Sequence, residues 1–400
     1  MPEPEKGGRA RSLFSFCAFH FLDDGFTDSI YLILPFIAAE LHLSFSQVGL
    51  LKGAFSASMS LSQFPLSLLG EKVGELTMIA CGTFGLAGGF LILSRSHTFW
   101  TILLSLIFAK GTAGGQHGLA SSILSRAFEA SGRRAAMGTY NFSGDLGKVC
   151  LPFLVALMIN LWSWRASIFI LSLGGFVAGA ILWTLAEQKK VPPPFLPGKE
   201  TLAGKASGWG IRNRQSFFAL LTIGVIDIAA RLALLTFLPF LLLQKGIPST
   251  KVGFALTLLF AGGATGKFAC GVLAEWLGII RMVVATEILT TIGILSLLWS
   301  SPPLVWVILP LVGIVLNGTS SVLYATVAEI ISPPGRSRGY GLYYAITLGC
   351  GAISPMVYGV VTDSLGLPFT IMSIALMVLI TIPLSRYLSP RPGSPDFLNS

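Results

Sequence analysis

The chain has 400 residues, of which 53% are hydrophobic and 11% charged, and its formal net charge is +9. Soluble domains usually carry about 25% charged residues, so this composition excludes an ordinary soluble enzyme or binding domain. The mean hydropathy of +0.76 is typical of a chain whose helices lie in a membrane. The five cysteines show no CxxC or Cys/His ligand spacing, so we interpret them as small buried residues and expect no metal site.

Twelve apolar runs follow one another along the chain, and each is long enough to cross a bilayer as a helix. Because lipid offers the backbone no hydrogen-bond partners, each run is predicted to be α-helical. The predicted fold is therefore an all-α integral membrane protein with twelve transmembrane helices. The runs cover residues 13–39, 46–70, 76–94, 98–123, 136–160, 165–186, 215–243, 251–273, 279–299, 303–327, 339–361 and 366–388.

The distribution of lysine and arginine predicts the orientation of these helices. If both termini lie on one side, most of the 27 lysines and arginines fall in segments on that side. Positively charged segments face the cytoplasm, so we expect cytoplasmic termini and a location in the inner (plasma) membrane. The net charge then needs no nucleic-acid partner to explain it.

The first run carries ionisable residues along one face. His20, Asp24 and Asp28 are one helical turn apart, and Asp23 and Tyr31 lie on the adjacent stripe. Two carboxylates one turn apart repel each other, which favours a proton on one of them. We therefore predict Asp28 as the first choice for a proton carrier, Asp24 as the second and His20 as a relay. Asp23 is assigned a structural role.

Later runs carry further ionisable or polar residues at lipid depth. Each charge costs about 2.5–3.5 kcal/mol at a helix centre, so each requires a partner or a watery cavity. Two interpretations stay open: these residues bind a substrate, or they form ion pairs that let the helices insert. The residues are Lys110 and His117, Asp145 and Lys148, Asp227 and Arg231, and the neutral Asn317 and Tyr324.

Similar residues recur at a constant spacing in the two halves of the chain. Asp23 recurs as Asp227, and Gly74 recurs as Gly278. An ordered series of this kind predicts an internal repeat of two six-helix halves in the same orientation. The predicted parts are an N-terminal half at residues 1–186, a polar, Pro/Gly-rich cytoplasmic linker at 187–214 and a C-terminal half at 215–400.

Two parallel six-helix halves joined by an inner linker resemble the major facilitator superfamily. The loop signature of that family is similar to two segments of this chain, each following the second helix of its half. The resemblance implies a conformational gate whose carboxylates pair with bases only when the inner side is closed; the alternative is a solvated turn. Ser67 and Leu76 depart from the signature in the first copy. The implied gate residues are Glu71, Lys72 and Gly74, and Glu275, Gly278 and Arg281.

A narrower resemblance covers roughly residues 15–155. The segments His20-Phe-Leu-Asp23-Asp24, Gly111-Thr112 with His117-Gly118, and Gly144-Asp-Leu-Gly147 look like the fosmidomycin-resistance branch of this superfamily. That branch contains drug exporters driven by proton exchange and members of unknown substrate. The second half of the chain resembles the superfamily only in general.

Together these patterns predict a proton-coupled antiporter that exports a small anionic or zwitterionic compound by alternating access. The substrate is expected between Lys110, His117 and Arg231. The alternatives are a proton-coupled symporter that imports an organic anion and, in another class, a non-transporting membrane sensor. The GxxxxGK[ST], HExxH and GxSxG patterns are missing, so we predict neither an ATP-driven pump nor an enzyme. We expect a monomer without a cofactor, whose partners are protons, a small molecule and the lipid bilayer.

Overall fold

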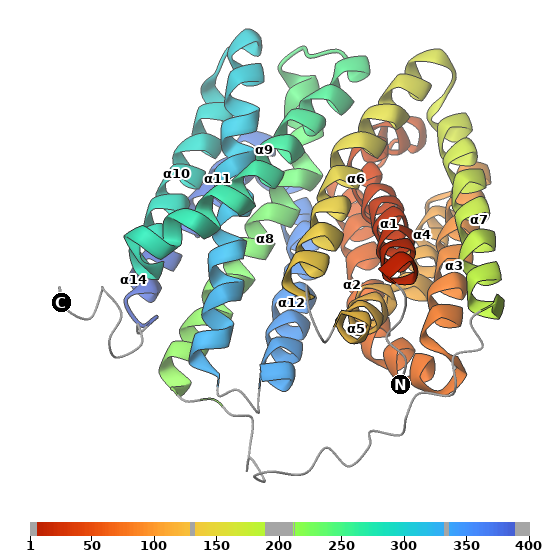
Figure 1. The fold of residues 1–400 in the computed structure, drawn as a ribbon. Coiled ribbons are helices and arrows are strands. Elements are labelled where there is room, and N and C mark those ends of the chain that lie inside the picture. Colours follow the sequence, from red (N-terminus) through yellow and green to blue (C-terminus); the bar gives the residue numbers. More distant parts are fainter. Residues whose placement is uncertain (1–5, 129–132, 189–210, 212, 332–335, 389–400) are drawn as a thin grey trace. The chain divides into compact units, whose positions relative to one another are not determined.

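The computed structural model describes residues 6–128, 133–188, 211, 213–331 and 336–388. Within these residues the helices are joined by short turns, and one isolated bridge connects Ile211 and Ile331. Most of the predicted linker at 187–214 lies outside the described residues. Figure 1 shows the helices in chain order: α1 (Lys6–Leu41), α2 (Phe45–Val73), α3 (Glu75–Arg95), α4 (Phe99–Ala113), α5 (Gln116–Ala127), α6 (Arg133–Leu161), α7 (Trp164–Gln188), α8 (Arg214–Gln244), α9 (Ser249–Leu277), α10 (Ile279–Trp299), α11 (Pro302–Ile330), α12 (Arg336–Leu365), α13 (Leu367–Val378) and α14 (Thr381–Ser385).

Each predicted apolar run corresponds to one helix or to two consecutive helices, so the predicted all-α fold is confirmed. The run at 98–123 is broken into α4 and α5 at Gly114 and Gly115, and the last run is broken between α13 and α14. Among the described residues, nine helical segments are long and apolar enough to cross a membrane. Helix α1 is not in that group, and it carries three aspartates.

The chain divides into two compact units. One unit comprises Met1–Leu43 and Ala54–Glu200, and the other comprises Ser44–Gly53 and Thr201–Ser400. In the first unit α1 packs on α6, and α3 packs on α4 and α7; in the second unit α8 packs on α12, and α10 packs on α11 and α13. The same pairing order in both units reflects the internal repeat that the residue spacing predicts. The first turns of α2 differ from the predicted halves, since they group with the second unit.

Two equivalent glycines begin equivalent helices. Gly74 precedes α3 with φ of 103°, and Gly278 precedes α10 with φ of 82°. Residues with a side chain rarely adopt such positive φ values, which explains glycine at both positions. The repeat is therefore visible in the turns as well as in the helix pairing.

The first turn of α2 is held by Asp363 of α12. The Asp363 carboxylate accepts hydrogen bonds from the backbone N–H groups of Phe45 and Ser46, both at 2.8 Å, and from the Ser46 hydroxyl. A carboxylate in this position satisfies N–H groups that have no partner within the helix. A Cβ added at Gly49 would lie 2.1 Å from the Pro355 carbonyl oxygen, so α2 approaches α12 closely here.

Glycines on α6 bring this helix against α1. A Cβ at Gly147 would lie 1.9 Å from the Phe21 carbonyl oxygen, and one at Gly144 would lie 2.6 Å from Asp24 Oδ2. Small residues at a helix crossing allow close backbone approach. The contact places α1 side chains within reach of the polar residues of α6.

Candidate functional site

Six ionisable side chains from four helices gather in the first unit. We call them the charged cluster. Each of its four contributing helices supplies at least one charged or ionisable group. The members are His20, Asp23 and Asp24 of α1, Lys110 of α4, His117 of α5 and Lys148 of α6.

Asp23 forms the more deeply buried ion pair of the cluster. Lys110 Nζ lies 3.1 Å from Asp23 Oδ1 and 3.2 Å from Asp23 Oδ2, and both side chains are almost fully buried. His117 Nε2 lies 3.2 Å from Asp23 Oδ2. The sequence predicts a structural role for Asp23, and in the structure its carboxylate shares His117 with that of Asp24. The Lys110 ammonium is thus already compensated by a carboxylate.

Asp24 contacts three basic side chains. Lys148 Nζ lies 3.0 Å from Asp24 Oδ2, His20 Nε2 lies 3.4 Å from the same oxygen, and His117 Nε2 lies 3.6 Å from Oδ1. Lys148 Nζ is also 3.6 Å from Asp145 Oδ1 on the same helix. His117 therefore bridges the two α1 carboxylates, and Lys148 joins α1 to α6.

The position of one His20 proton follows from its neighbour. His20 Nδ1 lies 2.7 Å from the Tyr140 carbonyl oxygen, and the imidazole stacks on the Tyr140 ring at 4.0 Å between centroids. A carbonyl oxygen only accepts, so Nδ1 carries a hydrogen. In a neutral imidazole Nε2 would then present a lone pair to the Asp24 carboxylate. Two facing acceptors repel, so this geometry favours a second proton between His20 and Asp24.

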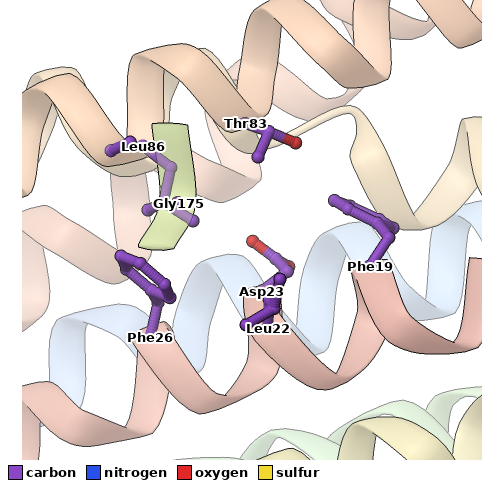
Figure 2. A pocket seen from close by; sticks show the side chains of 8 residues that line it. Phe19, Leu22, Asp23, Phe26, Thr83, Leu86 and Gly175 are labelled. Carbon is purple, nitrogen blue, oxygen red and sulfur yellow. The ribbon is translucent and has the colours of Figure 1, made fainter. Parts of the chain in front are cut away.

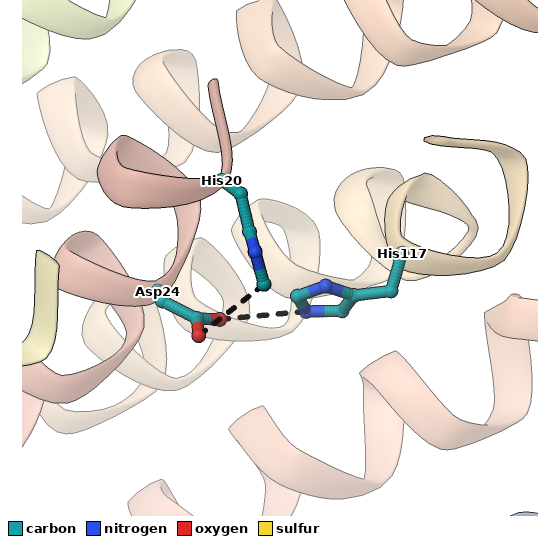
Figure 3. A group of neighbouring side chains, drawn as sticks. All are labelled: His20, Asp24 and His117. Atoms are coloured by element: carbon teal, nitrogen blue, oxygen red, sulfur yellow. Dashed lines mark ion pairs between the residues drawn. The ribbon is translucent and has the colours of Figure 1, made fainter. Parts of the chain in front are cut away.

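His20, Asp24 and His117 also have the residue types of a metal site. One ligand atom from each lies within 4.8 Å of the others. Figure 3 shows that the two imidazole rings point toward the Asp24 carboxylate. Lys148 already contacts Asp24 and Lys110 contacts Asp23, so two ammonium groups would repel a divalent cation at this place. The chemistry of the cluster therefore suits protons and ion pairs better than a metal.

The break between α4 and α5 positions His117. Helix α5 begins at Gln116, whose side-chain amide donates to the Ile79 carbonyl at 3.0 Å and to Thr83 Oγ1 at 2.9 Å. These hydrogen bonds attach the start of α5 to α3. His117 is the next residue, so its side chain leaves the first turn of a short helix. A helix N-terminus carries a partial positive charge, which adds to the basic character of this region.

A small pocket opens beside Asp23. It is lined by side chains of α1 and α3 and by Gly175 of α7. Figure 2 shows the Asp23 carboxylate rising from α1 among these residues, with Thr83 on α3 above it. Phe19 and Phe26 supply much of the apolar lining. This pocket is too apolar to recognise a charged molecule, and we interpret it as a packing space next to the ion pair.

The other residues predicted on α1 lie near the cluster. Asp28 is half-buried and interacts electrostatically with Lys148. Tyr31 is 1% exposed. The predicted face of His20, Asp24 and Asp28 thus approaches α6, and the His20–Asp24 contact lies on it.

The predicted polar residues of the second unit form a separate group. Arg231 Nη1 donates to Asn317 Oδ1 at 3.3 Å, and Arg231 also interacts electrostatically with Asp227 one turn before it. Tyr324 packs its ring against those of Tyr343 and Tyr344, at 5.8 and 5.1 Å between centroids. Lys110 and His117 belong to the first unit and Arg231 belongs to the second, so the predicted substrate position between them stays a prediction.

The predicted gate residues lie at the turns after α2 and α9. Lys72, Glu275 and Arg281 are exposed, and Gly74 and Gly278 form the turns themselves. The Glu71 side chain lies outside the described residues. The gate role of these residues also stays a prediction.

Two further buried charges lie outside the charged cluster. Lys52 on α2 is 2% exposed, although a lysine near a helix end would be expected to reach the surface. Glu287 on α10 is 1% exposed, and sequence reasoning assigns it a structural role. Hydropathy cannot predict that these side chains are buried, because a single charge in an apolar run does not reveal which neighbouring helix it faces.

Comparison with known proteins gives consistent results. Residues 15–322 and 220–399 match the family model described as Major Facilitator Superfamily. An uncharacterised MFS-type transporter of Bacillus subtilis is 24% identical over 392 residues, which cover 91% of this chain and 89% of that protein. A fosmidomycin resistance protein of Escherichia coli is 23% identical over 367 residues, which cover 86% of this chain and 84% of that protein.

A solved structure resembles the fold over nearly the whole chain. It is a bacterial homologue of the human lysosomal transporter Spinster, with a TM-score of 0.81 and 16% sequence identity. The match covers 96% of this chain and 97% of the other. At this identity the likeness concerns the fold, and the charged cluster has to be interpreted from its own geometry.

Proposed function

Because the chain belongs to the major facilitator superfamily and is a multi-pass membrane transporter, we propose that it couples transport of a small zwitterionic or anionic compound to protons bound by the charged cluster. The observation that carries the proposal is the His20–Asp24 contact. The Tyr140 carbonyl fixes one proton on His20 Nδ1, and the remaining nitrogen faces a carboxylate 3.4 Å away. A site built in this way can gain or lose a proton with a small change in geometry.

The surrounding charges link this proton to a substrate. With neutral histidines, the cluster contains two carboxylates and two ammonium groups, which compensate one another in pairs. A proton on Asp24 would leave Lys148 with the more distant Asp145 carboxylate alone, and a proton on Asp23 would release Lys110. The released ammonium could then bind a negative group. The start of α5 beside His117 would favour the same group, as interrupted helices do in other transporters.

Antiport is the first form of this coupling. A zwitterionic substrate would bring its own cationic group to Asp24 and compete there with the proton, while its negative group binds a lysine. Substrate and proton would then occupy the site in turn, which is the condition for exchange. The similarity to a protein named for fosmidomycin resistance agrees with export by exchange. Asp28, near Lys148, would extend the proton path along α1.

Symport is the second form, and the compensated lysines favour it for a purely anionic substrate. Such an anion could bind only after a carboxylate has taken up a proton, so proton and anion would bind together and cross together. The charge of the substrate therefore decides which form operates. Either form uses alternating access, in which the binding site opens to one side of the membrane at a time.

Purified protein in liposomes that contain a pH-sensitive dye would test the proposal. Fosmidomycin is the first probe, followed by a panel of amino acids and small carboxylates. When a transported probe enters, antiport should raise the lumenal pH and symport should lower it. Transport of any probe without a change in lumenal pH would contradict proton coupling.

Two substitutions connect that measurement to the cluster. Asp24→Asn should abolish transport driven by a pH gradient and preserve exchange of substrate across the membrane, because asparagine imitates the protonated carboxyl. Asp28→Asn, the first choice from sequence, should be compared with it. Glu40→Gln serves as a control at a carboxylate outside the cluster and should transport normally. Retention of gradient-driven transport in Asp24→Asn would remove this residue from the coupling mechanism.

A further inference from the structure

The second unit contains a buried acidic pair outside the charged cluster. Asp227 of α8 is 4% exposed, and Glu287 of α10 is 1% exposed. Among the described residues, Asp227 Oδ2 and Glu287 Oε1 have no hydrogen-bond partner. Ile223 of α8 and Val283 of α10, each one helical turn before these residues, lie in the same hydrophobic core. The two carboxyl groups follow that core on neighbouring turns and interact electrostatically with each other.

The helices around the pair supply little compensating charge. Arg231 of α8 is the cation that acts on Asp227, and it also donates to the neutral Asn317 of α11. From α12, the Tyr343 hydroxyl interacts with Asp227. Helix α9 carries the half-buried Lys267, and α13 and α14 carry no titratable residue. Among the described residues, the charged group that acts on Glu287 is Asp227 itself.

Two ionised carboxylates would be unstable in this place. A buried charged oxygen that accepts no hydrogen bond loses its hydration without replacement. Two such groups near each other also repel. Arg231 can compensate one negative charge, but the pair would carry two. One bound proton removes both the excess charge and the repulsion, and the remaining charge is left beside Arg231.

We propose that Asp227 and Glu287 together bind one proton at neutral pH and form a second proton-binding site, in the C-terminal half of the chain. The proton comes from water and no other bond changes. The site differs from the charged cluster because its acids share a proton with each other, whereas those of the cluster pair with lysines. The inference goes beyond the proposed function, since the pair holds its proton whether or not protons drive transport.

Infrared spectroscopy of the purified full-length protein would test the inference. A protonated carboxylic acid has a C=O stretching band that shifts in heavy water and that an ionised carboxylate lacks. We expect such a band at neutral pH. Glu287→Gln should remove it, because Asp227 then ionises beside Arg231. Glu40→Gln should leave the band unchanged.

The outcomes separate this inference from the proposed function. A band that belongs to the charged cluster would respond to Asp24→Asn and not to Glu287→Gln, so each proposal can fail alone. If the spectrum of folded Glu287→Gln has lost no protonated-carboxyl band relative to wild type, the inference is overturned. A wild-type spectrum without such a band overturns it as well. If Glu287→Gln does not fold, Asp227→Asn replaces it. The band must then shift or disappear, and an unchanged band overturns the inference.

Discussion

Glu40, in the last turn of α1, is held by two residues at the start of α7. Its Oε1 accepts from Arg165 Nη2 at 2.7 Å and from Nε at 3.2 Å, and its Oε2 accepts from Trp164 Nε1 at 2.8 Å. The hydrogen bonds from Arg165 hold the pKa of the Glu40 carboxyl below its usual range. We predict that Glu40→Gln lowers the free energy of unfolding of the purified protein by at most about 1 kcal/mol, because the Glu40–Arg165 pair is partly exposed.

This effect depends on pH with a defined sign. The unfolded chain takes up the Glu40 proton at an ordinary pKa of about 4.3, and the folded protein takes it up only at lower pH. The stabilisation is therefore present above the ordinary value and is lost as the pH falls through the lowered one. Melting curves of wild type and Glu40→Gln should differ at neutral pH and converge in acid. Melting curves that differ equally at neutral and at acid pH would contradict the lowered pKa of Glu40.

The Asp23–Lys110 pair predicts a different response, because both side chains are buried. Removal of one partner leaves an uncompensated charge and costs about 3–5 kcal/mol in comparable pairs. We predict a large loss of stability for Asp23→Asn or for Lys110→Gln alone, and a smaller loss for the double variant than the two single losses together. A double-mutant cycle of thermal unfolding in detergent measures this coupling. Strictly additive losses would show that the contact contributes no coupling energy.

Part of the charged cluster could be predicted from single residues. Helical spacing alone places His20 and Asp24 on one face, and they contact each other at 3.4 Å. The same spacing places Asp23 on another stripe and cannot reveal that Lys110 faces it from α4. That contact depends on which helices pack together and at what rotation, and hydropathy contains neither. The Tyr140 carbonyl, a backbone group, gives no sequence signal at all.

At the scale of helices, the glycines of α6 determine how closely α1 approaches. A Cβ at Gly147 would lie 1.9 Å from a backbone oxygen of α1, so the helices would have to separate. We predict that Gly147→Ala destabilises the protein by about 1–3 kcal/mol, as overpacking usually does, and that it also weakens the Asp24–Lys148 contact. Gly138→Ala on the same helix is the matched control, since a Cβ there meets nothing. Equal losses of stability for Gly147→Ala and Gly138→Ala in thermal unfolding would contradict the prediction that the Gly147 contact is the cause.

The helices themselves could be predicted well from apolar runs, and their interruptions could not. The run at 98–123 stays apolar through Gly114 and Gly115, where α4 ends and α5 begins. The break follows from tertiary contacts, because the Gln116 amide bonds to α3 and a Cβ at Gly114 would meet Met59 of α2. Such contacts between distant segments are not visible in a local window.

For the whole molecule, the charge distribution predicts cytoplasmic termini and a cytoplasmic linker. A single cysteine introduced as Ala203→Cys, in a background without the five native cysteines, should resist a membrane-impermeant thiol reagent in intact cells. His97→Cys, between α3 and α4, should react readily. The rates of labelling measure the difference. Efficient labelling at position 203 would reverse the orientation.

The family could be predicted from the repeat and the loop signature, and the match to the superfamily model confirms that prediction. The substrate and the form of proton coupling could not be predicted from the sequence in the same way. The proposed coupling rests on a few side chains whose partners lie on other helices, as the ion pairs of Lys110 and Lys148 do. Two sequences can share every apolar run and differ in those contacts.

The aspartates of α1 have a consequence for synthesis of the protein. At the centre of a membrane helix, each of Asp23, Asp24 and Asp28 costs about 3 kcal/mol on insertion scales. Helix α1 on its own therefore inserts poorly when it leaves the ribosome. Its compensating lysines lie on α4 and α6 and are made only after much of the first unit. Ribosome-bound chains that end before Lys110 should therefore hold α1 loosely in the bilayer, and chains that extend beyond Lys148 should hold it firmly. On this prediction, the ion pairs of the charged cluster set the order in which the first helix becomes anchored.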